Sequence, residues 1–184
     1  MAANHSELNE PVIEIQRITT RFDQFEDRIV IHAETTGPEN VSLWMTQRLL
    51  LRLIPHLLDR LDHLISPQHK SGTANKRTDT LMQTFAQQSA CQTLDWQAPV
   101  QESAPDRHYL VSSVDITATE QQTRLIFKSL CPDTLKLVML AAELRQWLMI
   151  CHSLWGKAQW PMHIWPVWIT EQDVDTSRSK VSLH

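Results

Sequence analysis

One order of sequence patterns occurs twice in this chain of 184 residues, and the repetition constrains the fold more than any other feature. In the first half, the segments "VIEIQRITTRF" and "RIVIHAET" alternate apolar and polar residues on either side of the polar turn "DQFED". Such alternation predicts two strands joined as a hairpin. After the break "TGPEN" comes "VSLWM", which predicts a third, short apolar strand.

The segment that follows, residues 47 to 65, predicts a helix with one wide apolar face. Thr46 is its expected N-cap, because a threonine hydroxyl can accept a hydrogen bond from a free amide of the first turn. The apolar face consists of seven leucines, Leu49, Leu50, Leu53, Leu57, Leu58, Leu61 and Leu64. A face of this width needs cover from another layer of structure.

The same order returns in the second half. The segments "VSSVDITAT" and "TRLIFKS" predict a hairpin, "LKLVM" a third strand, and "LAAELRQWLMICHSLWGKAQW" a helix. We interpret the pattern as an internal duplication of a ββ(β)α unit. Chance resemblance between two amphipathic stretches is the alternative.

The predicted fold class is α+β. Two ββ(β)α units in tandem place their strands in one antiparallel or mixed sheet, with the two long helices on one face and a Trp-rich strand at the C-terminal end. The expected parts are a flexible N-terminus (1–10), a single domain (11–169) with pseudo-repeats (11–65 and 109–160) joined by a mobile polar linker (66–108), and a disordered tail (170–184).

The linker contains one segment of helical character, "TLMQTFAQQSACQTL". Its spacing predicts a short amphipathic helix with Leu81, Met82, Phe85 and Ala86 facing inward.

Glycine usage disfavours several enzyme classes. The chain has only Gly37, Gly72 and Gly156, and none of them belongs to a GxGxxG, GxxxxGK or GxSxG motif. Phosphate-binding loops and nucleophile elbows need such glycines, because the backbone must turn tightly or approach a ligand closely. Nucleotide-dependent and α/β-hydrolase chemistry are therefore disfavoured.

Charge and cysteine usage limit the partner and the compartment. A formal net charge of −4 argues against generic attraction to nucleic-acid phosphates. The two longest apolar segments, 43–65 and 135–155, carry charged residues, so they are not expected to span a membrane, and the N-terminus lacks the pattern of a secretory signal. Three isolated cysteines favour the reducing cytoplasm.

Two polar constellations lie on the first helix. His56, Asp59 and His63 share one face and are weak candidates for a metal site, with a solvated polar stripe as the alternative. Arg48 and Arg52 lie near the helix start, where the helix dipole disfavours cations. A salt bridge to the sheet or a partner of complementary charge would explain the two arginines, as would chance.

The pair Cys151 and His152 does not predict a catalytic dyad. Neighbouring residues of a helix point about 100° apart. Cys151 aligns with apolar Leu57 of the first half, and we expect it in the core.

The segment "WPMHIWPVWIT" at residues 160–170 has the highest density of aromatic residues in the chain. As a strand it would be apolar on both faces, and Pro166 would confine it to an edge or a bulge. An apolar edge strand rich in tryptophan is a natural docking site. The alternative is that Trp147, Trp155, Trp160 and Trp165 pack together in the core.

These patterns together predict a non-enzymatic, cytoplasmic protein that acts through protein contacts, as an adaptor, an assembly factor or a subunit of a larger complex. A homodimer or a protein partner is expected, and no cofactor. The predicted partner-binding residues are Trp160, His163, Trp165, Val167, Trp168, Arg48 and Arg52. The alternatives are nucleic-acid binding on the sheet face with help from basic loop residues, and a metal-dependent enzyme using the His56, Asp59 and His63 face.

Overall fold

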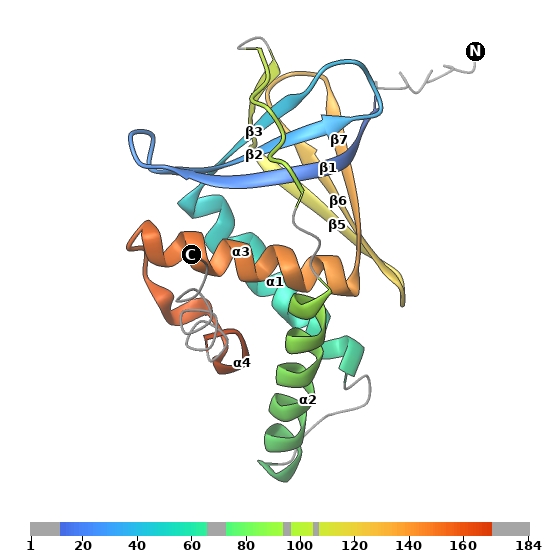
Figure 1. Cartoon of the computed structure of the whole chain (residues 1–184), viewed down its shortest axis with the longest axis vertical. Helices are drawn as coiled ribbons and strands as arrows, with labels where there is room; N and C mark the ends of the chain where they lie inside the picture. Colours follow the sequence, from blue (N-terminus) through green and yellow to red (C-terminus); the bar gives the residue numbers. More distant parts are fainter. Residues whose placement is uncertain (1–11, 66–72, 94–96, 105–106, 171–184) are drawn as a thin grey trace, which may run out of the picture.

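The computed structural model describes residues 12–65, 73–93, 97–104 and 107–170, which form an α+β fold (Figure 1). The first half contains β1 (Val12–Asp23), β2 (Arg28–Thr35), β3 (Val41–Thr46), α1 (Gln47–Ile65) and α2 (Thr73–Gln92). The second half contains β4 (His108–Leu110), β5 (Ser113–Ala118), β6 (Gln122–Lys128), β7 (Thr134–Leu140), α3 (Ala141–Lys157), a 3₁₀ turn (Met162–Ile164) and α4 (Val167–Thr170).

The seven strands form one mixed sheet in the order β4-β3-β2-β1-β7-β6-β5. The strands β1 to β3 and β5 to β7 are two antiparallel meanders, and β1 joins them by pairing in parallel with β7. β4 pairs in parallel with β3. The predictions of an α+β class and a mixed sheet are confirmed.

The sheet is curled, and its two ends meet in one segment of the chain. β4 and β5 stand at opposite ends of the strand order, yet only Val111 and Ser112 separate them. The amide of Val111 donates to the carbonyl of Trp44 in β3 (2.9 Å), and the amide of Ser112 donates to the carbonyl of Lys128 in β6 (2.8 Å). The three-residue strand β4 forms one edge of the sheet, and β5, which pairs only with β6, forms the other.

The core lies between the curled sheet and the two helices α1 and α3, which lie on the same side of the sheet (Figure 1). The amide of Leu49 donates to the Thr46 hydroxyl (3.2 Å), so the predicted N-cap of α1 is confirmed. The residues of α1 that are buried in this layer are Leu50, Leu53, Ile54, Leu57, Leu58 and Leu61. The buried residues of α3 are Leu144, Arg145, Trp147, Leu148, Cys151, His152, Leu154 and Trp155.

The Trp-rich segment is not a strand, and that prediction is wrong. Residues Met162–Ile164 form a 3₁₀ turn and Val167–Thr170 a short helix. The physical reason is twofold. The prolines at 161 and 166 cannot donate to a sheet ladder, and the carbonyl of Pro166 instead accepts from the amide of Ile169 (3.1 Å), which begins a helical turn.

The region between the halves contains α2 and a packed segment, residues 97–104, that we call the strap. The strap crosses the outer face of β1 to β3: the amide of Val100 donates to the Thr19 hydroxyl (2.9 Å), and Arg17 donates to the carbonyl of Ala98 (2.5 Å). Val100 is buried by this contact. The predictions for residues 1–10, 66–72 and 171–184 lie outside the described residues.

Candidate functional site: the outward face of helix α2

Helix α2 exposes its apolar residues to solvent. The side chains of Leu81, Met82 and Phe85 are 58%, 54% and 64% exposed. The sequence predicted that they face inward, and this is wrong. Since large apolar side chains gathered on one exposed surface mark interaction sites, we take these three residues, the α2 patch, as the candidate site.

The opposite face of α2 is polar and buried, and its hydrogen bonds fix the orientation of the helix. The side-chain amide of Gln83 donates to the carbonyl of Leu61 (3.1 Å) and to a carboxylate oxygen of Asp62 (2.6 Å), while its oxygen accepts from Arg145 (2.5 Å). Gln87 donates to the backbone carbonyl of Arg145 (3.1 Å). Rotating the helix to bury the α2 patch would break these bonds and leave buried polar groups without partners.

Arg145 of α3 explains why a polar helix face is needed here. Its side chain is buried and lies over the ring of Trp168, with 5.4 Å between the guanidinium carbon and the ring centroid. Burial lowers the pKa of Arg145 to about 10, and burial also raises the pKa of Asp62. Gln83 joins the two groups, because a buried charge needs hydrogen-bonding neighbours.

The C-terminal half of α2 is anchored on α3. Besides the two glutamines, Gln146 of α3 donates to the carbonyl of Ala90 (2.7 Å), and the sulfur atoms of Cys91 and Met149 lie 3.0 Å apart. From residue 77 to 82, by contrast, every residue except half-buried Asp79 is exposed. Figure 1 shows the N-terminal end of α2 pointing away from the sheet.

The predicted docking tryptophans lie in the interior. Trp160, Trp165 and Trp168 are all buried. The ring of Trp155 makes edge-to-face contacts with the rings of Trp160 (4.9 Å between centroids) and Trp165 (5.6 Å). This arrangement agrees with the alternative interpretation, in which the tryptophans close the core.

The other predicted partner-binding residues are accessible. His163 and Val167 are exposed beside the buried tryptophans, and Arg48 and Arg52 are exposed on α1.

The predicted metal-site residues lie on the exposed face of α1. One carboxylate oxygen of Asp59 is 3.4 Å from the Nε2 atom of His63, and both side chains are exposed. Within the part of the chain that the structure describes, no group of three His, Cys, Asp or Glu side chains has the geometry to hold a metal ion.

The nucleophilic side chains of the interior are poorly placed for catalysis. Cys151 lies in the core, as predicted, and burial raises the pKa of its thiol. A thiol that stays protonated is a weak nucleophile. The hydroxyl of Ser42 is 2.9 Å from the Nδ1 atom of His32, and both residues are buried beneath the strap.

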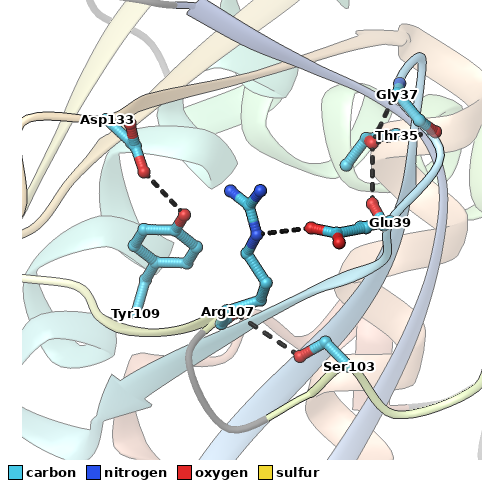
Figure 2. A network of polar contacts seen from close by, with 7 residues as sticks. All are labelled: Thr35, Gly37, Glu39, Ser103, Arg107, Tyr109 and Asp133. Atoms are coloured by element: carbon cyan, nitrogen blue, oxygen red, sulfur yellow. Dashed lines mark hydrogen bonds and ion pairs between the residues drawn. The ribbon is translucent and has the colours of Figure 1, made fainter.

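A polar network ties together the loops at one end of the sheet (Figure 2). The hydroxyl of Tyr109 in β4 donates to Asp133 before β7 (2.7 Å), and Arg107 donates to Glu39 before β3 (2.7 Å). The network also holds the Thr35 hydroxyl, which donates to the carbonyl of Glu39 (2.9 Å). These bonds connect β4 and the residue before it to the loops that precede β3 and β7, and we assign the network a structural role.

No protein-family model matches the chain, and neither the curated proteins nor the solved structures contain a match. No described helix has the length and apolar character needed to cross a membrane.

Proposed function

We propose that this chain is a protein-binding protein without catalytic activity, an adaptor or assembly component, and that the α2 patch is its contact surface. The observation that supports the proposal is the reversed orientation of α2. Buried hydrogen bonds hold its glutamines inward and so keep Leu81, Met82 and Phe85 in water. Such an arrangement lowers stability unless a partner covers the apolar face.

The size of the patch sets the expected strength of the contact. Full burial of a leucine, methionine or phenylalanine contributes about 1.5–3 kcal/mol, whereas association itself costs about 4–15 kcal/mol. Three side chains that are already partly covered therefore support a weak, reversible contact. The proposal moves the predicted interface from the Trp-rich segment to α2, since tryptophans in the core cannot serve as anchors without unfolding.

A photoreactive benzoyl-phenylalanine in place of Phe85 tests the proposal. The variant chain is irradiated in two samples, one in an extract of the source cells and one as the purified chain. In at least one of them, the group at position 85 should form a covalent adduct with a protein. The matched control carries the same group at Phe25, which is 90% exposed in the turn between β1 and β2. Adducts from position 25 alone, or none from position 85 in either sample, would contradict the proposed site.

The internal duplication and the cytoplasmic location also belong to this proposal. Each half has three antiparallel strands followed by a helix, and positions 94 apart in α1 and α3 share burial, as Leu50 and Leu144 or Leu57 and Cys151 do. These features support a common origin of the halves. The free thiols, including exposed Cys131, support a reducing compartment.

A further inference from the structure

We infer that the partner of the α2 patch is a second copy of this chain, and that the two α2 helices pair antiparallel with Leu81 of one copy against Phe85 of the other. The inference rests on the proposed function, because it names the occupant of the same surface. Two observations support the inference: the outward face of α2 is uncharged, and its N-terminal half extends away from the sheet.

The outward face of α2 can meet a copy of itself without electrostatic repulsion. From residue 78 to the end of the helix at Gln92, Asp79 is the only charged residue, and it is half-buried near the inner face. The outward stripe in this range consists of Thr78, Leu81, Met82 and Phe85 followed by uncharged Gln88 and Ser89. A surface without charge gives strongly basic or acidic partners no ion pairs to form. The same surface can pack against its own copy across a two-fold axis without like-charge repulsion.

The projecting half of α2 selects the antiparallel direction. The C-terminal half is anchored on α3 through Gln87 and Ala90, while the N-terminal half extends away from the sheet. In a parallel pair the two bodies would compete for space at the same end. In an antiparallel pair the bodies lie at opposite ends, and each projecting half lies along the outward face of the other copy's anchored half.

The antiparallel register also separates the exposed arginines. If Leu81 of one copy faces Phe85 of the other, the two-fold axis that relates the two helices passes level with residue 83. Thr78 of one copy then faces Gln88 of the other. With a rise of 1.5 Å per residue, Arg77 and its copy lie about 18 Å apart along the helices, beyond the Debye length at physiological salt. A projecting helix is also marginal on its own, and the second helix would stabilise it.

Solution mass tests the occupant. A standard interface buries about 800 Å² per partner, and the α2 patch with its polar neighbours is smaller, so we expect a dimer with a dissociation constant on the order of micromolar. Light scattering of the full chain should show a mass that rises with concentration from one chain toward two. The variant Leu81→Gln with Phe85→Gln should stay monomeric throughout, while Phe25→Gln with Leu130→Gln, which changes two exposed apolar residues elsewhere, should dimerise like the parent.

Disulfide trapping tests the direction. In a Cys91→Ala, Cys131→Ser background, chains carrying Thr78→Cys are mixed with chains carrying Gln88→Cys and oxidised. The mixture should form a covalent dimer. Thr78→Cys alone should not, because its two copies lie about 15 Å apart in the antiparallel pair and a disulfide needs Cα atoms closer than about 7 Å.

The outcomes separate this inference from the proposed function. Bridging by Thr78→Cys alone would mean a parallel pair and would overturn the geometry. A monomer at every concentration would overturn the second copy as occupant; the proposed function would then survive only if the photoreactive group at position 85 captured a different protein. Failure of both experiments would overturn both.

Discussion

At the scale of single residues, His32 is a histidine whose environment opposes protonation. It lies on the outer face of the sheet beneath the strap, where its Nδ1 atom is 2.9 Å from the Ser42 hydroxyl, and the Ser103 hydroxyl donates to Ser42 (2.9 Å). Burial lowers the pKa of His32, Arg21 and His108 lower it further, and Glu102 opposes them. A protonated His32 would put an added positive charge beneath the strap.

This lowered pKa gives the stability a pH dependence of known sign. The unfolded chain takes up the proton near the ordinary value of 6.5, whereas the folded chain resists it. The contribution of neutral His32 to the free energy of unfolding is therefore complete above pH 6.5 and is lost as the pH falls toward the lowered pKa. We expect His32→Asn, whose amide can keep the bond to Ser42, to lose less stability than the parent between pH 7 and 5.

Urea unfolding at several pH values measures the difference. His163→Gln, which changes an exposed histidine, is the matched control and should follow the parent. If His32→Asn and the parent lost stability in parallel, protonation of His32 would not be what weakens the strap.

At the scale of elements, local patterns predicted the strands β2 and β3 and the helix α1, together with their counterparts β6, β7 and α3. In these elements every apolar residue that alternation or helical spacing places inward meets the same core, so pattern and packing agree. Pairing between distant strands, such as the parallel contact of β1 with β7, leaves no trace in local periodicity and could not be predicted.

Helix α2 shows where such patterns fail for a physical reason. Its apolar residues share a face with Thr78 and Ser89, and its glutamines lie opposite, so spacing predicted burial of the apolar side. The neighbouring layer, however, contains the buried guanidinium of Arg145, which requires polar contacts. The glutamines at 83 and 87, one turn apart, were the sequence signal for a buried polar face. Their partner, Arg145, lies 58 to 62 residues further along the chain, so local spacing could not reveal it.

The C-terminal turn and helix α4 stabilise the core through their tryptophans. The ring of Trp165 packs edge to face on His152 (5.1 Å) and on Trp155. We expect Trp165→Ala to lower the free energy of unfolding by about 3–5 kcal/mol, the usual cost of a large aromatic truncation in a core. Val167→Ala, on the exposed side of the same segment, should change it by less than about 0.5 kcal/mol.

Urea denaturation followed by far-UV circular dichroism gives both values. The contrary outcome is a Trp165→Ala chain that keeps the parent's denaturation midpoint but no longer self-associates. That result would place the interface in the Trp-rich segment, as the sequence predicted.

At the scale of the whole molecule, one short segment of the chain joins the two ends of the curled sheet. The segment that contains β4 and β5 contacts β3 at one end and β6 at the other. Tyr109, buried in β4, reaches across to Asp133 at the start of β7 (Figure 2). Because this bond joins the two meanders, it should couple the stability of one half to that of the other.

A double-mutant cycle measures that coupling. Tyr109→Phe removes only the hydroxyl, and Asp133→Asn removes only the charge. Since a hydrogen bond to a charged group contributes about 1.5–3 kcal/mol, each single variant should cost up to that amount, and the double variant little more than either one. The coupling energy from urea unfolding should then exceed that of the exposed pair Lys128 and Asp115 (2.7 Å), for which about 0.2–1 kcal/mol is typical.

The slope of the urea unfolding transition is the second quantity that tests the coupling between the two halves. With the bond intact, the two meanders should unfold in one transition; without it, the slope of the transition should fall, because each half can open separately. Additive single-variant costs and an unchanged slope would mean that β4 and the shared core, and not the bond between Tyr109 and Asp133, hold the ends of the sheet together.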